Sequence, residues 1–386
     1  MVDVTSYDVI VIGVGSMGSA TCYYLAKRGY KVLGLEQFDI SHEFGSHAGQ
    51  SRIIRKAYFE HPDYVPLLEK AYDSWKQLEQ ETGEQLYFKT GLLYAGTSNN
   101  EIIKGVKLAA SLYNIELEKL DSKDVADRFS QFNFPKTFDV LFEPEAGFLP
   151  PEKAIRFYAS QATKNGATIH SNEKVIAWEK KGSGVTVKTD KQTYQCNKLI
   201  ITAGAWAGKM IPGFADKINV TRQFVAWIKT KNDDQFKLNR FPCWMIGDDD
   251  KHGCYYGFPL LDTKKFGEPA GLKLAHHYPR DITDPDKVNR QTTENDIENL
   301  KYCLNKYLPG VFESVLSTKI CLYANSPDEN FIIDKLPGYE ENVSIACGFS
   351  GHGFKFASVV GEILADFAIE GKTELPIEFL NAKRFV

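Results

Sequence analysis

The chain has 386 residues, of which 43% are hydrophobic and 25% charged, so it is too long for one compact core and too apolar to be disordered or fibrous. Its 46 basic and 50 acidic residues are well mixed and give a formal net charge of -4, which argues against nucleic acid or anionic lipid as a partner. The longest apolar stretch, residues 9–14, is far short of the roughly 20 residues of a membrane helix, so we expect a cytoplasmic protein with no membrane partner.

The first elements of the chain predict a βαβ unit. Residues 7–12 form a run that is apolar and β-branched apart from Asp8, which is typical of a strand buried on both faces of a parallel sheet. Residues 16–27 carry small and apolar side chains at helical spacing, and Gly29 ends this predicted helix. Residues 31–35 then indicate a second strand, which is followed directly by Glu36.

The sequence GVGSMG at residues 13–18 matches the pattern GxGxxG between that strand and that helix. Gly13 allows a tight turn, Gly15 lets the backbone approach a pyrophosphate, and Gly18 lets the helix pack closely. The free N–H groups of the helix start bind phosphate oxygens, and Glu36, 18 positions after Gly18, would hold ribose hydroxyls. The motif indicates a dinucleotide, but FAD and NAD share it, so both remain open at this point.

Two further helices and three strands are predicted between residues 64 and 202. One helix covers residues 64–82 and is expected to be capped by Asp63. The other covers residues 152–165 and is stopped by Gly166. The strands that follow are expected at residues 167–170, 184–189 and 198–202.

The second half of the chain changes in character. Residues 223–322 are rich in aromatic strand segments and contain a charged stretch at residues 279–298, which predicts a separate, largely antiparallel domain. A strand at residues 342–347, a glycine turn and a helix at residues 354–370 close the chain.

Several separated motifs resemble the monomeric sarcosine oxidase family, which includes sarcosine, N-methyltryptophan and pipecolate oxidases. They are GSHAGQSRIIRKAY at residues 45–58, YYGFP at 255–259, GLKL at 271–274, CLY at 321–323, SPDENFIID at 326–334 and GFSGHGFKF at 348–356. Their order and spacing match that family over essentially the whole chain. The resemblance implies a monomeric, FAD-dependent oxidase of a small secondary amino acid that uses molecular oxygen and releases hydrogen peroxide.

The same resemblance implies an α/β fold of two domains. A Rossmann-type FAD-binding domain is expected from three separate segments, residues 1–87, 150–222 and 324–386. An α+β substrate domain with a largely antiparallel sheet is expected from residues 88–149 and 223–323, and it would cover the isoalloxazine ring.

The resemblance also implies that FAD is covalently bound, through a thioether between Cys321 and the flavin 8α-methyl group. Leucine stands at position 322, where the family commonly has methionine. The seven cysteines are an odd number with no CxxC pair, so neither a disulfide framework nor a metal site is expected. The expected cofactor-binding residues are Ile12, Gly13, Gly15, Ser16, Met17, Gly18, Glu36, Gln37, Gly45, Ser46, Ser51, Arg52, Val175, Thr202, Gly204, Trp206, Cys321, Phe349, Gly351, His352, Gly353, Phe354 and Lys355.

The catalytic residues are likewise assigned by resemblance. Arg55 and Lys355 would hold the substrate carboxylate from two sides, because an arginine binds a carboxylate with two parallel hydrogen bonds and a lysine adds a further donor. Arg52 would stabilise the negative charge of the reduced flavin. The substrate amine would be oxidised to an imine, which water hydrolyses, so that sarcosine would give glycine and formaldehyde.

Four more side chains complete the expected site. Lys273 would stabilise the charge that develops on oxygen, and His277 would help to orient the substrate. Tyr256 and Tyr323 would form aromatic walls that favour the neutral amine.

The resemblance leaves the substrate open. The family often has histidine where Ala48 stands, and the bulky Trp244 and Met245 belong to a segment expected near the substrate. Residues 50–58 look closest to pipecolate oxidases and residues 325–334 to N-methyltryptophan oxidases, so sarcosine is a central estimate. Alternatives of other classes are a flavin dehydrogenase that passes electrons to a quinone or protein, an NAD-dependent reductase and a non-catalytic FAD-binding module.

Overall fold

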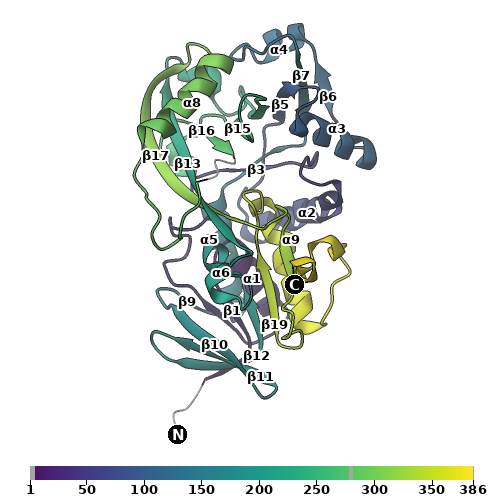
Figure 1. Ribbon diagram of the computed structural model, residues 1–386, viewed down its shortest axis with the longest axis vertical. Helices are drawn as coiled ribbons and strands as arrows, with labels where there is room; N and C mark the ends of the chain where they lie inside the picture. Colours follow the sequence, from purple (N-terminus) through teal and green to yellow (C-terminus); the bar gives the residue numbers. More distant parts are fainter. Residues whose placement is uncertain (1–4, 278–280, 386) are drawn as a thin grey trace.

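The computed structural model describes residues 5–277 and 281–385, and in this part of the chain the strands form two sheets of eight strands and one of three. The first large sheet and its helices occupy the lower half of the molecule in Figure 1, and the second large sheet occupies the upper half. This mixed α/β arrangement confirms the predicted fold class.

The first sheet has a parallel centre built from segments that are far apart in the sequence. β1 (Ser6–Ile12) pairs in parallel with β2 (Val32–Leu35) and with β12 (Thr193–Ile201). β2 continues the sheet to β9 (Thr168–His170), and β12 continues it to β19 (Val343–Cys347). The antiparallel strands of the sheet are β10 (Val175–Lys181), β11 (Gly184–Thr189) and β18 (Ile332–Lys335). The predicted βαβ unit therefore lies at the centre of a discontinuous Rossmann-type sheet.

Three helices pack together against this sheet. They are α1 (Ser16–Lys27), α5 (Pro151–Lys164) and α9 (Ala357–Ile369). The crossing of α1 and α9 is so close that a Cβ on Gly361 would lie 2.5 Å from the Cβ of Ala20. α2 (Val65–Thr82) packs on the outside of α9. No helix of the described residues is long and apolar enough to cross a membrane.

The second sheet is largely antiparallel, as predicted, because β14 and β5 are its only parallel neighbours among the described residues. Its strands, in spatial order, are β17 (Phe312–Asn325), β13 (Asn219–Thr230), β16 (Leu272–His277), β15 (Cys254–Gly257), β14 (Cys243–Gly247), β5 (Leu92–Thr97), β7 (Phe138–Glu143) and β6 (Glu118–Leu120). The small sheet consists of β3 (Arg52–Ile54), β8 (Gly147–Leu149) and β4 (Phe88–Lys89). The remaining helices are α3 (Glu101–Tyr113), α4 (Ser122–Arg128), α6 (Ala207–Met210), α7 (Thr263–Phe266) and α8 (Glu294–Tyr307).

Some local predictions were wrong. Asp63 does not cap α2: it lies inside a 3-10 turn at Pro62–Tyr64, which is capped by the side chain of His61. The predicted last helix begins as a 3-10 turn at Phe354–Phe356 and becomes α-helical only at α9. Part of the charged stretch at residues 279–298 forms the unpredicted helix α8, while its first two residues lie outside the described residues.

Candidate functional site

Both large sheets contribute to one cavity of about 680 Å³. Ile12 and Leu35 line it from the ends of β1 and β2, whereas Val225 and Tyr256 line it from β13 and β15 of the second sheet. A cavity of this size is typical of ligand sites, and open α/β sheets bind ligands at the carboxyl ends of their parallel strands. The cavity is therefore the candidate site.

The residues predicted to contact cofactor or substrate gather around this cavity, except Gly18, Ser51 and Lys273. Those that line it are Ile12, Gly13, Gly15, Ser16, Met17, Glu36, Gln37, Gly45, Ser46, Arg52, Arg55, Val175, Thr202, Gly204, Trp206, Tyr256, His277, Cys321, Tyr323, Phe349, Gly351, His352, Gly353, Phe354 and Lys355. Gly18 lies under the glycine loop, where a Cβ would be 1.9 Å from the carbonyl oxygen of Gly13. Ser51 and Lys273 are fully buried behind the cavity wall.

The glycine loop between β1 and α1 leaves room for a ligand. Gly13 has a φ of +87°, and a Cβ there would lie 2.6 Å from the carbonyl oxygen of Thr202. A Cβ on Gly15 would meet no described atom within 4 Å, so the backbone of Gly15 faces open space. No side chain of the described residues caps α1, so the N–H groups of its first turn are available for an anion.

Glu36 directly follows β2 and binds the backbone of this loop. Its carboxylate accepts hydrogen bonds from the backbone N–H of Val14 (2.9 Å) and of Phe38 (3.1 Å). Burial raises its pKa to about 7, although these two N–H groups oppose the shift. His42, which the sequence reasoning missed, lies 3.5 Å from the same carboxylate and also lines the cavity.

Cys321, Arg52 and Ala48 form a compact group on another wall. The thiol of Cys321 donates to the carbonyl oxygen of Ala48 at 3.2 Å, and the guanidinium of Arg52 donates to the same oxygen at 2.6 Å. The sulfur lies 4.0 Å from the guanidinium, which can stabilise negative charge that develops on sulfur. All seven cysteines are free and buried, and of these Cys321 lines the cavity.

The residues of this half of the cavity fit a dinucleotide. The open backbone at Gly15 suits a pyrophosphate, and the carboxylate of Glu36 suits ribose hydroxyls. His47, which the sequence reasoning did not select, lines the cavity and its buried Nε2 has no hydrogen-bond partner among the described residues. Within the same residues, no group of three or more His, Cys, Asp or Glu could hold a metal ion.

Arg55 meets a partner that the sequence reasoning missed. Its guanidinium donates to both carboxylate oxygens of Glu60, at 2.6 and 2.7 Å, and both residues line the cavity. Burial alone would raise the pKa of Glu60, but the positive charges of Arg55, His352 and Lys355, together with the hydrogen bond from Arg55, outweigh burial and lower that pKa to about 2. Glu60 is therefore ionised, and an incoming carboxylate must compete with it for Arg55.

Lys355 lies near this pair, in the middle of the 3-10 turn before α9. Its Nζ donates to the carbonyl oxygen of His352 at 2.6 Å and approaches the hydroxyl of Tyr58 at 3.5 Å. Burial, together with the positive charge of Arg55, lowers its pKa to about 7. Arg55 and Lys355 are therefore close enough for the charge of one to shift the pKa of the other. Of the two, only Arg55 forms an ion pair with a carboxylate of the described residues.

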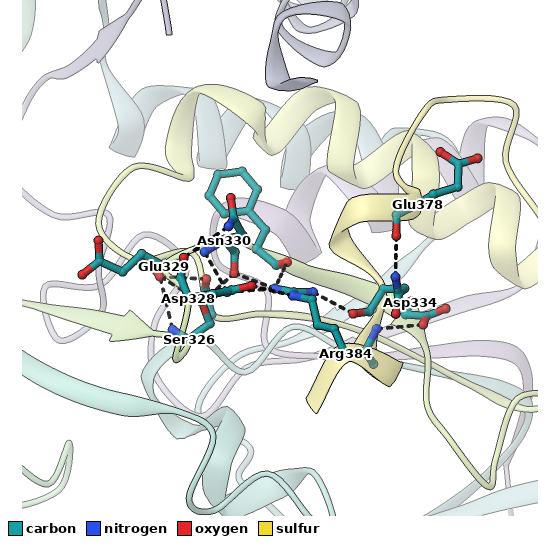
Figure 2. Close-up of polar contacts among 12 residues, drawn as sticks. Ser326, Asp328, Glu329, Asn330, Asp334, Glu378 and Arg384 are labelled. Atoms are coloured by element: carbon teal, nitrogen blue, oxygen red, sulfur yellow. Dashed lines mark hydrogen bonds and ion pairs between the residues drawn. The ribbon is translucent and has the colours of Figure 1, made fainter. Parts of the chain in front are cut away.

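The SPDENFIID motif at residues 326–334 holds His352 from behind. The backbone carbonyl of Glu329, which has a φ of +61°, lies 3.1 Å from Nε2 of His352. Figure 2 shows how Arg384 clamps this segment through the carboxylate of Asp328 and the carbonyl of Asn330. If Nε2 carries the proton, Nδ1 of His352 accepts from the hydroxyl of Tyr58 at 2.5 Å.

The remaining predicted residues form a buried polar and aromatic wall. Nδ1 of His277 lies 2.9 Å from the hydroxyl of Tyr323, and burial lowers the pKa of His277 to about 3, so this histidine is neutral. The Tyr256 ring meets that of His277 edge to face at 6.2 Å. Met245 lines the cavity, whereas Trp244 packs with Phe132 in the core.

Comparisons with known proteins agree with this geometry. Residues 8–367 match the model of the DAO family, described as FAD dependent oxidoreductase. The chain is 38% identical to a monomeric sarcosine oxidase of Bacillus sp. (strain NS-129), over 98% of this chain and 97% of that protein. It is 34% identical to an N-methyl-L-tryptophan oxidase of Yersinia pestis (strain Pestoides F), over 98% and 99% of the two chains.

Two solved structures share the fold. NikD, an unusual amino acid oxidase essential for nikkomycin biosynthesis, superposes with a TM-score of 0.83 at 24% identity, over 98% of this chain and 97% of that chain. An L-proline dehydrogenase of P. horikoshii superposes with a TM-score of 0.81 at 22% identity, over 99% and 98% of the two chains. At these identities the likeness concerns the fold alone.

Proposed function

The chain belongs to the DAO family of FAD dependent oxidoreductases, and on that premise we propose that it oxidises a secondary amino acid, N-methyl or cyclic, with sarcosine as the central candidate. The observation that carries the proposal is the placement of Arg55 and Lys355 at one cavity with a glycine loop and Glu36 built for the cofactor. The similarity to a sarcosine oxidase and an N-methyl-L-tryptophan oxidase supports the substrate class.

The reaction balances with oxygen as the acceptor. The substrate loses the hydrogens of its adjacent C–H and N–H bonds, as two electrons and two protons, and becomes an imine. Water then hydrolyses the imine to an aldehyde and an amine. Oxygen gains the two electrons and two protons and becomes hydrogen peroxide. Bound FAD supplies the capacity to take two electrons from one reactant and pass them to the other.

The residues of the chain position the substrate and hold charge. Arg55, released from Glu60, would bind the carboxylate in two-point fashion, and Lys355 would add a donor. The neutral His277 with Tyr323 and Tyr256 offers a wall that disfavours a charged amine, which must lose its proton before oxidation. The monomer, the covalent link through Cys321 and the division into domains at residues 1–87, 150–222, 324–386 and 88–149, 223–323 belong to the same proposal.

A substrate panel tests the function. Sarcosine, N-methylalanine, pipecolate, proline and N-methyltryptophan are each added to the purified protein under air, and hydrogen peroxide is measured. Peroxide from at least one secondary amino acid is expected, with none from the matched primary amine glycine above the background. Reduction of the cofactor without peroxide would instead point to a dehydrogenase.

Lys273→Met tests the oxygen step separately from substrate oxidation. The ammonium is expected to stabilise negative charge on oxygen. Removing a group of this kind typically lowers the rate of the step that it assists by about a hundredfold or more. We expect reoxidation by oxygen to slow by about that factor, while anaerobic reduction by substrate changes little. Stopped-flow measurement of the two half-reactions checks this, and equal slowing of both would remove the assignment.

The pH dependence of carboxylate binding tests Lys355. Its pKa of about 7 lies below the ordinary value of 10.5, so the ammonium is present below pH 7 and is lost as the pH rises through that value. Inhibition by propionate, which has no amine to titrate, should weaken by about tenfold per pH unit above 7 if binding requires the ammonium. Lys355→Met should remove this dependence, and an unchanged pH profile in that variant would refute it.

A further inference from the structure

The loop that leads into β3 contains a strained turn. The N–H of Ser51 donates to the carbonyl oxygen of Gly49 at 2.8 Å, and Gln50 between them has a φ of +71°. These are the features of a γ-turn with positive φ at its centre, a conformation that a residue with a side chain adopts only where its surroundings hold it. Strained backbone of this kind is concentrated at functional sites.

The inner side of this turn holds the ammonium of Lys273. Nζ of Lys273 donates to the carbonyl oxygen of Gly49 at 2.5 Å, to that of Ser51 at 2.6 Å and to the hydroxyl of Ser51 at 3.2 Å. An ammonium has three donors, so the turn accounts for all of them. The position of the ammonium therefore depends on the conformation of residues 49–51.

The outer side of the turn is held by Glu152, the second residue of α5. One carboxylate oxygen accepts from the N–H of Gly49 at 2.6 Å and from that of Gln50 at 3.1 Å, and the other oxygen lies 3.2 Å from the N–H of Gln50. The side chain of Gln50 braces the turn further, because it donates to the carbonyl of Gly267 and accepts from the indole of Trp227. Glu152 also lines a second cavity of about 370 Å³, outside the one that holds the predicted site.

The charges around Lys273 make the carboxylate electrostatically important as well. Burial lowers the pKa of Lys273 and the charge of Arg52 lowers it further, whereas the charge of Glu152 opposes both. Burial alone would raise the pKa of Glu152, but the N–H groups of Gln50 and Gly49 and the charge of Arg52 keep it below its ordinary value. The neighbouring His47 is neutral, because burial lowers its pKa to about 4.

We propose that Glu152 is a positioning residue for the oxygen-dependent half of the reaction, in which it fixes the turn at residues 49–51 and thereby the ammonium of Lys273. The inference rests on the proposed function through the role of Lys273. The carboxylate acts through the turn, because Glu152 does not line the cavity that holds the predicted site, and it offsets part of the positive charge of Lys273 and Arg52.

Glu152→Gln in the holoenzyme tests the proposal, because glutamine keeps an acceptor oxygen but loses the charge. The cofactor is reduced with dithionite under anaerobic conditions and mixed with oxygen. We expect reoxidation to slow by about tenfold, which is less than the hundredfold or more that follows the loss of a group that stabilises the charge directly, because glutamine keeps one acceptor oxygen for the turn. The pH above which reoxidation declines should also move lower, because removing the carboxylate lowers the pKa of Lys273 further.

Hydrogen exchange supplies a measurement that does not depend on activity. The amides of Gly49 and Gln50 should exchange faster in Glu152→Gln, since their acceptor is weakened. Glu84→Gln is the matched control, because Glu84 pairs with Lys153 of the same helix at 2.7 Å and does not contact the turn. It should change neither the exchange of these amides nor the rate of reoxidation.

The outcomes separate this inference from the proposed function. Dithionite reduces the cofactor without any amino acid, so a failed substrate panel leaves the test of Glu152 intact. Unchanged reoxidation in Glu152→Gln, or equal slowing of reoxidation and of reduction by substrate, would overturn the inference. If Glu152→Gln does not fold, Glu152→Asp is the second variant. Its side chain is one methylene shorter and moves the carboxylate away from the turn, so it must show the same faster exchange and slower reoxidation.

Discussion

Replacement of Cys321 by alanine is expected to abolish covalent attachment of FAD. Cys321 lines the cavity, and its sulfur lies 4.0 Å from the guanidinium of Arg52 and is hydrogen-bonded to the carbonyl of Ala48, so we propose it as the thiol that attaches the cofactor. After precipitation with acid, the parent protein should give a yellow pellet, because a thioether survives denaturation. The variant should give a colourless pellet and a yellow supernatant.

Cys254→Ala is the control for this experiment. Cys254 is a buried thiol of β15 in the same sheet as Cys321, but it does not line the cavity. Its replacement should leave the flavin in the pellet. A yellow pellet from Cys321→Ala, or a colourless one from the parent, would show that the attachment is made elsewhere or not at all.

Loss of Arg55 is expected to reduce kcat/KM for the amino acid by about a thousandfold. An arginine gives a carboxylate two charge-assisted hydrogen bonds, each worth about 2 kcal/mol, and a total of about 4 kcal/mol corresponds to about three powers of ten. Arg55→Met alone would leave the carboxylate of Glu60 buried without its partner, which is itself destabilising. The informative variant is therefore the double substitution Arg55→Met, Glu60→Gln, measured by steady-state kinetics.

Glu60→Gln alone is the matched reference. It removes the carboxylate that competes for Arg55 at 2.6 Å, so it should bind the substrate at least as well as the parent, with a lower KM. The thousandfold loss should then appear between the single and the double variant. A difference of less than tenfold would mean that Arg55 does not bind the substrate carboxylate.

Some parts of the site could be predicted from the residues alone, without the resemblance to a family. In these parts the residues are close together along the chain. The glycine loop, the start of α1 and Glu36 belong to one βαβ unit, so their spacing alone predicts that they meet a common ligand. Arg52 and Cys321 are 269 residues apart, and no periodicity or spacing connects them. Their proximity was expected only from the resemblance to a family.

The residues that were missed act through tertiary contacts. Glu152 lies 103 positions from Gly49, from whose N–H it accepts a hydrogen bond. An acidic residue near the start of a helix is common on protein surfaces, so the sequence gives no sign of this contact. Glu60 is only five positions from Arg55, but an acidic residue in a loop near an arginine has no distinct pattern. Helix α8 could have been found, because Leu300, Cys303, Leu304 and Tyr307 form a buried stripe at helical spacing behind the charged residues.

The cap of α2 failed for a local reason. Asp63 has the composition of a cap, but Pro62 fixes the preceding residue in an extended conformation, so that His61 becomes the capping residue of a 3-10 turn. The helix itself was predicted to within one residue, since its apolar stripe at Leu68, Tyr72, Trp75 and Leu78 is buried. The spacing of apolar residues therefore predicted the position of α2 correctly, whereas the residue type expected at a helix cap did not predict how the helix begins.

The most direct test of the account is the visible absorption of the purified protein during anaerobic addition of the secondary amino acids. The account predicts a yellow protein whose flavin absorption is lost on addition of sarcosine or a related secondary amino acid and returns with air, with one hydrogen peroxide formed per amine oxidised. A colourless protein that binds no added FAD, or a flavin absorption that none of these amino acids diminishes, would contradict it.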